Sequence, residues 1–184
     1  QQIKHFLAFE AAYSLALGEA GIVDKSSASE ATKLIKAFKP DVAKLRAGME
    51  KDGVAIPELV RQLRSAAPEL TDAIHTGATS QDVVDTALCI TIRDMNNLLE
   101  ERLKALGGAL SQLDNSFGNN PMMGRTRMQA ALKTNARTRI ASWQIAVGEN
   151  IERLGKIRSS VEKVQLGGAV GDNQKLDNNA ALIA

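Results

Sequence analysis

Apolar side chains recur every three or four residues along most of the chain, which is the spacing of a helix with one buried face. Over residues 3–20 the apolar positions include Phe6, Tyr13 and Leu17, and the pattern ends at Gly21. Shorter amphipathic stretches follow, separated by Pro and Gly residues that favour turns. They cover residues 29–36, 41–51 and 58–66. The pattern therefore predicts short helices, joined by tight turns, before residue 70.

Two much longer apolar stripes follow these short helices. The first runs from Ser80 to Phe117 without a proline, and the second runs from about Met128 to Val164. At about 1.5 Å per residue, the first of these helices would be too long for its short neighbours to cover. We expect two long antiparallel helices joined at residues 119–126. The predicted fold class is all-α, with short N-terminal helices followed by the long helices of a bundle.

The change from short to long helices predicts two domains. Residues 1–74 are expected to form a small helical domain, and residues 75–184 the start of a central long-helix domain that is incomplete within this sequence. The long apolar stripes have no further helices to cover them among these residues. This favours either association with other copies or a longer natural chain.

Composition excludes several function classes. The 23 Lys and Arg residues and the 21 Asp and Glu residues alternate and leave a net charge of +2, which disfavours a nucleic-acid partner. Cys89 is the one cysteine and the 2 histidines are not paired at ligand spacing, so no disulfide and no metal site are expected. No apolar run reaches the length of a membrane span and no signal peptide is recognisable. We expect a cytoplasmic protein with no membrane partner.

Polar and small residues gather directly before the first long helix, over residues 75–82. The hydroxyl of Thr79 or Ser80 is placed to cap the helix, and its first backbone N–H groups would then favour a carboxylate or phosphate ligand. An ordinary helix start, in which Asp82 complements the helix dipole, is the alternative interpretation. The imidazole of His75 and the two small residues before the cap favour a binding site, because they allow a ligand to approach the backbone.

Two arginines, a hydroxyl and an amide converge at the expected start of the second long helix. These residues are Arg125, Thr126, Arg127 and Gln129. Guanidinium groups bind carboxylates through two parallel hydrogen bonds, so the segment is a candidate second anion-binding site. A basic loop that faces water is the alternative interpretation.

Together, the two motifs resemble signatures of the fumarase/aspartase superfamily of all-helical lyases. Residues 77–88 and 124–132, with Ala141-Ser142-Trp143, look most like its 3-carboxy-cis,cis-muconate cycloisomerase branch. The resemblance extends from the first helix to Gly-Gly-Ala-Val-Gly at residues 167–171, the amino-terminal half of the family pattern. The family's Ser-Ser-x-Met-Pro-x-Lys-x-Asn loop, which carries a catalytic serine, does not occur in these 184 residues.

This resemblance implies a homotetramer whose active sites are shared between subunits. It also implies a small polycarboxylate substrate and chemistry through an aci-carboxylate, without any cofactor. In the cycloisomerase branch a carboxylate of 3-carboxy-cis,cis-muconate adds across the conjugated diene and closes 4-carboxymuconolactone, a step of protocatechuate catabolism in the beta-ketoadipate pathway. Since the serine loop is not among the 184 residues, we expect them to be inactive alone.

Carried over residue by residue, the resemblance makes Thr126 and Arg127 the catalytic candidates. The substrate-binding candidates are His75, Thr79, Ser80, Arg125 and Gln129. Lyases that release fumarate often have a histidine acid/base directly after that threonine. Arg127 cannot give up its proton near neutral pH, and it therefore favours the cycloisomerase branch.

Two alternatives remain open. One is a fumarate-releasing lyase such as adenylosuccinate lyase. The other is an inactive helical scaffold that lacks the catalytic serine loop. Lys133 and Asp172, which depart from the family pattern, favour the scaffold.

Overall fold

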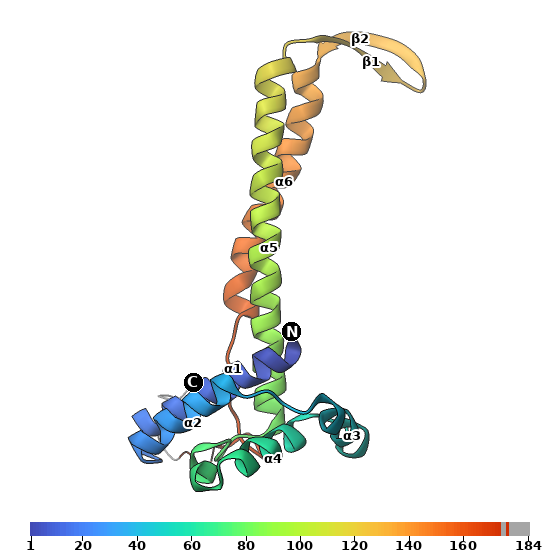
Figure 1. Cartoon of the computed structure of the whole chain (residues 1–184). Helices are drawn as coiled ribbons and strands as arrows, with labels where there is room; N and C mark the ends of the chain where they lie inside the picture. The colour runs from blue at the N-terminus through green and yellow to red at the C-terminus, as the bar shows by residue number, and fades with distance from the viewer. Residues whose placement is uncertain (174–175, 177–184) are drawn as a thin grey trace. The chain divides into compact units, whose positions relative to one another are not determined.

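Helices form most of the chain in a computed structural model that describes residues 1–173 and Leu176 (Figure 1). In order, the elements are α1 (Gln2–Glu19), α2 (Lys25–Ala37), α3 (Val42–Asp52), α4 (Ile56–Ala66), the 3-10 helix η1 (Pro68–Ala73), α5 (Ser80–Phe117), β1 (Pro121–Thr126), β2 (Gln129–Asn135) and α6 (Ala136–Val161). The all-α prediction is confirmed, with one two-stranded sheet added. None of the helices within the described residues is long and apolar enough to cross a membrane.

The chain divides into two compact units. The first comprises Gln1–Thr91 together with the segment from Glu162 onward, and the second comprises Ile92–Val161. The expected division into domains at residues 74 and 75 stays a prediction.

The short N-terminal helices are confirmed, and local side chains account for their ends. The Asp24 carboxylate accepts hydrogen bonds from the first turn of α2, and Asp41 does the same for α3. Gly53 ends α3 with a φ of 75°, in the left-handed region that glycine adopts without strain. Pro57 lies in the first turn of α4, where its missing N–H removes no helical hydrogen bond.

The first unit has an aliphatic core made by α1, α2, α4 and the first turns of α5. Its fully buried apolar side chains include Leu17, Ile35, Ile56, Leu59, Leu63, Ile74 and Val83. Helices α1 and α2 come close together at Gly18, where an added Cβ would lie 2.5 Å from the Ala28 Cβ. Because Ile74 and Val83 are anchored on either side of residues 75–79, the core holds both ends of this loop.

In the second unit, α5 and α6 run antiparallel, as predicted. Arg137 Nε lies 3.0 Å from Asp114 Oδ1, and Arg158 Nη2 lies 2.8 Å from Glu100 Oε2. Many large apolar side chains of these helices are exposed. They include Leu99, Leu106, Phe117, Trp143, Ile145 and Ile157. The described part of the chain thus leaves the long apolar stripes uncovered.

The prediction that the second long helix begins near Met128 is wrong. Residues 121–135 form an antiparallel hairpin, in which Thr126 pairs with Gln129 across a two-residue turn. Arg127 and Met128 have φ values of 44° and 70°, the left-handed geometry of a tight hairpin turn. Helix α6 begins only at Ala136, after the Asn135 side chain accepts a hydrogen bond from the Thr138 N–H.

Candidate functional site

The loop between η1 and α5 is held by side chains of two other helices. Tyr13 of α1 donates a 2.7 Å hydrogen bond to the Thr76 carbonyl, and Arg64 of α4 donates one of 2.8 Å to the Ile74 carbonyl. Between these two anchors His75 has a φ of 59°, which is uncommon for a residue with a Cβ. Strained backbone of this kind persists where the surrounding structure holds it, often at functional sites.

A pocket of about 230 Å³ opens beside this loop, within the first unit. It is lined by Arg64, His75, Thr76, Gly77, Ala78, Gly168, Ala169, Val170 and Asp172. Its two walls meet at glycines, since a Cβ on Gly168 would lie 3.1 Å from the Gly77 carbonyl oxygen. A cation, an imidazole and backbone close enough for a ligand to approach give this pocket the means to hold a small anion.

Asp82 joins these two walls. Its side chain is buried, and Oδ1 accepts a 2.8 Å hydrogen bond from the Gly167 N–H. Oδ2 accepts from the Gly168 N–H at 3.1 Å and from the Thr79 N–H at 2.9 Å. The carboxylate therefore does more than complement the helix dipole. It ties the start of α5 to a turn 85 residues later in the chain.

The expected hydroxyl cap of α5 is not formed. The helix begins at Ser80, and within residues 1–173 and 176 neither the Thr79 nor the Ser80 hydroxyl makes a hydrogen bond. Asp82 instead reaches back to the Thr79 N–H, which is one half of a capping box. Both residues are partly buried and follow the pocket residue Ala78 in the chain, although neither lines the pocket itself.

His75 also contacts a residue that the sequence did not single out. Its Nδ1 lies 2.7 Å from Oε1 of Glu10, whose side chain is fully buried on α1. One feature of the sequence could have indicated a buried partner for His75. Glu10 places a carboxylate on the apolar face of the first helix, directly after Phe9.

The candidates near Thr126 lie on the hairpin, in the second unit. Thr126 and Gln129 are directly opposite each other, so their side chains share one face, while Arg125 lies on the other face. Arg127 occupies the turn. All four residues are exposed, and within the described residues their side chains form no hydrogen bonds.

The structure thus brings the predicted residues together in two sets. His75, Thr79 and Ser80 lie at the start of α5, and the hairpin residues lie in the other unit. None of the hairpin residues lines the pocket beside His75.

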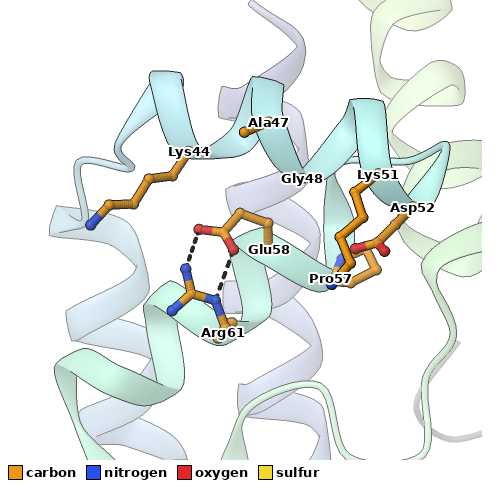
Figure 2. A pocket seen from close by; sticks show the side chains of 8 residues that line it. All are labelled: Lys44, Ala47, Gly48, Lys51, Asp52, Pro57, Glu58 and Arg61. Carbon is orange, nitrogen blue, oxygen red and sulfur yellow. Dashed lines mark hydrogen bonds and ion pairs between the residues drawn. The ribbon is translucent and has the colours of Figure 1, made fainter.

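Figure 2 shows a second pocket, of about 340 Å³, between α3 and α4. Its lining includes Lys44, Lys51, Glu58 and Arg61, but Arg61 already donates two hydrogen bonds to Glu58. Hydrogen bonds from Gln62 and then Arg61 lower the pKa of the Glu58 carboxyl. Arg61 and Glu58 therefore neutralise each other, which leaves Lys44, Lys51 and Asp52 as the other charged groups of this pocket. Among the described residues no group of His, Cys, Asp and Glu could hold a metal ion.

Burial and two nearby carboxylates shift the pKa of the Tyr13 phenol, which contacts this loop. Burial, followed by the negative charges of Asp82 and Glu10, raises the pKa of Tyr13 well above its ordinary value of 10.0. The phenol therefore stays protonated and keeps donating its hydrogen bond to Thr76.

Known proteins match this chain over nearly its whole length. A protein-family model described as lyase matches residues 2–183. N-acetyl-S-(2-succino)cysteine lyase from Enterococcus italicus is 31% identical over 165 residues, covering 90% of this chain and 36% of the relative. 3-Carboxy-cis,cis-muconate cycloisomerase from Pseudomonas putida is 32% identical over 187 residues, covering 100% of this chain and 44% of the relative.

A solved structure of similar fold is the fumarate lyase from Mesorhizobium sp. BNC1. It matches with a TM-score of 0.92 and 32% sequence identity, over 99% of this chain and 43% of that chain. The chain therefore spans less than half the length of these relatives.

Replacing Asp82 with Asn should destabilise the first unit by about 2–4 kcal/mol, because an amide group offers N–H donors to backbone N–H groups that need an acceptor. Urea unfolding of the unaltered protein and of Asp82→Asn measures the difference in the free energy of unfolding. Asp85→Asn, one turn along on the same helix, is the control, since within the described residues Asp85 accepts only from the Gln81 side chain. Equal effects of the two substitutions would contradict the role given to Asp82.

The raised pKa of Tyr13 predicts a loss of stability in alkali. Above about pH 10 the unfolded phenol gives up its proton while the folded one keeps it, so stability falls as pH rises. Tyr13 is the one tyrosine of the chain, so ultraviolet absorbance of phenolate reports it directly. We expect phenolate to appear only as the protein unfolds, and Tyr13→Phe to remove this pH dependence. Phenolate in the folded protein near the ordinary pKa would refute the assignment.

Proposed function

Because this chain belongs to the fumarate lyase superfamily of enzymes, we propose that the native protein is a 3-carboxy-cis,cis-muconate cycloisomerase. In this reaction a substrate carboxylate oxygen bonds to a carbon of the diene. The displaced electron pair moves into a second carboxyl group as an aci-carboxylate, and a proton then adds to the neighbouring carbon. Such a site needs fixed donors for carboxylates and for the charge that develops, and no cofactor.

The pocket beside His75 supports a carboxylate-binding role. Arg64 and His75 line it, and Thr79 and Ser80, whose hydroxyls make no hydrogen bond within the described residues, follow at the start of α5. The first backbone N–H groups of a helix favour anions, and here they adjoin a cation and an imidazole. We assign His75, Thr79 and Ser80 to one substrate carboxylate.

The observation that carries the choice of reaction is Arg127 at the hairpin turn. A guanidinium keeps its proton at neutral pH, so it stabilises negative charge but cannot serve as an acid/base. Closing a lactone places negative charge on a carboxyl group, and a fixed cation beside that group stabilises the charge. Thr126 and Gln129, side by side across the turn, would orient the same substrate, with Arg125 as a further anion contact.

We propose that the two sets of residues meet in a cytoplasmic homotetramer, where the hairpin of one copy completes the pocket of another. Support comes from the exposed apolar side chains of the long helices, Leu99, Leu106 and Trp143 among them, which a tetramer would bury. The separation of the two sets into different units of one chain is consistent with shared sites.

A lyase that releases fumarate is the second candidate. It is favoured by the similarity to N-acetyl-S-(2-succino)cysteine lyase, which is as high as that to the cycloisomerase. Arg127 disfavours it, because cleavage of this kind calls for a proton acceptor.

One assay separates these functions. Purified native protein is mixed with 3-carboxy-cis,cis-muconate, and the loss of diene absorbance is followed together with formation of the lactone. Lactone formation supports the cycloisomerase. Fumarate release from succinyl adducts such as adenylosuccinate, without lactone formation, supports the lyase. No turnover with either substrate class supports the scaffold, for which Asp172 in the pocket wall is an argument.

Replacing Ser80 with Ala in the native protein should lower kcat/KM for the muconate by roughly 10- to 150-fold. This is the factor expected when about 1.5–3 kcal/mol of hydrogen bonding to a charged group is lost. Ser29→Ala, at a partly buried serine of α2, is the matched control and should leave kcat/KM unchanged. An unaltered kcat/KM in Ser80→Ala would remove Ser80 from the binding site.

Replacing Arg127 with Leu should raise KM by about 10-fold or more, through loss of a charged contact to a carboxylate, and leave the melting temperature unchanged. Lys133→Leu removes the same charge from the other strand of the hairpin and serves as the control. A melting temperature that drops in step with the kinetics would instead make Arg127 a structural residue.

A further inference from the structure

Glu10 is a buried carboxylate that the packing of α1 does not explain. Its side chain is fully buried, and the one hydrogen bond or ion pair that it makes within the described residues is with His75. The second oxygen, Oε2, has no hydrogen-bond partner there. A buried charged group with so few partners is usually less stable than an apolar side chain of the same size. Stability alone therefore gives no reason for a glutamate at this position.

The contact between Glu10 and His75 determines where the imidazole carries its proton. Nδ1 lies 2.7 Å from Oε1, a length typical of a charge-assisted hydrogen bond. An ionised carboxylate only accepts hydrogen bonds, so Nδ1 must be the protonated nitrogen. Nε2 makes no hydrogen bond within the described residues, and the ring lines the pocket. Nε2 is thus the nitrogen open to a ligand.

Helix α1 holds the backbone of the same loop as well as the ring. Tyr13, one turn after Glu10, donates its hydrogen bond to the carbonyl of Thr76. Between them, these two side chains secure a histidine whose φ of 59° would otherwise be unfavourable. Both contacts converge on the position of one imidazole, which is what a binding or proton-transferring group requires.

We propose that Glu10 is a positioning residue that keeps His75 in the Nδ1–H tautomer, so that Nε2 exchanges a proton or hydrogen bond with the bound ligand. The identity of this ligand as a polycarboxylate rests on the proposed cycloisomerase function. The tautomer itself follows from the contact of His75 with Glu10.

The tautomer is measured by nitrogen NMR of the protein with labelled histidines, at a pH where the His75 signals show a single ring proton. His75 signals are identified by their loss in His75→Gln. Nδ1 of His75 should show the shift of a protonated nitrogen and Nε2 that of a bare one. His5, whose Nδ1 contacts Thr91 Oγ1, is the other histidine of the chain and gives the comparison signals. A proton on Nε2 with bare Nδ1 in the unaltered protein would overturn the proposal.

Variants at Glu10 connect the tautomer to catalysis. Glu10→Met keeps an apolar side chain of similar length in the core and removes the acceptor, so the Nδ1–H preference of His75 should be lost. We expect kcat/KM to fall by roughly 10- to 100-fold, the usual effect of removing the group that orients a functional histidine. Glu10→Gln retains an oxygen acceptor and should recover most of both readouts. Glu19→Met, at an exposed glutamate of the same helix, should change neither.

The NMR and kinetic measurements distinguish failure of the proposed function from failure of the role proposed for Glu10. If the native protein turns over no polycarboxylate, the proposed function fails, while the NMR result still decides the role of Glu10. If Glu10→Met loses activity with the His75 tautomer unchanged, Glu10 is only a structural residue and the present proposal is wrong.

Discussion

The carboxylate of Asp82 is the interaction on which the candidate site depends. Its two oxygens accept three backbone N–H groups, one from Thr79 and two from Gly167 and Gly168. Backbone donors buried at a helix start and at a glycine turn need acceptors, and one buried anion supplies them for both segments. Because the two segments form opposite walls of the pocket, its shape follows from these hydrogen bonds.

Near that carboxylate, the core of the first unit contains buried polar side chains. Glu10 and Tyr13 lie on the buried face of α1, among apolar side chains. Each contacts the short loop at His75 and Thr76. The aliphatic core therefore supplies the stability, and the buried polar groups hold one imidazole in one place. This division of roles is typical of a site that must be preorganised.

Most of the helices could be predicted from the sequence because their ends are decided locally. Asp24, Asp41 and Pro57 act within one turn of their own helices. The hairpin could not be predicted, because residues 130–132 carry a helical pattern and Arg127-Met128 lacks the Asn-Gly or Gly-Gly signature of a tight turn. The motif before α5 was identified for its polarity. Its partners, however, lie 65 and 85 residues away, and no local pattern links them.

The two sets of candidate residues are under different constraints, and this bears on how such a fold can host several reactions. His75 and Asp82 cannot change without disturbing the core and the loop, since both are hydrogen-bonded to distant segments. Arg127, by contrast, is exposed on a hairpin turn and forms no side-chain hydrogen bond within the described residues. Its identity is free of packing demands. In the proposed role of this residue, a cation or an imidazole there would give different proton chemistry without breaking a side-chain hydrogen bond within the described residues.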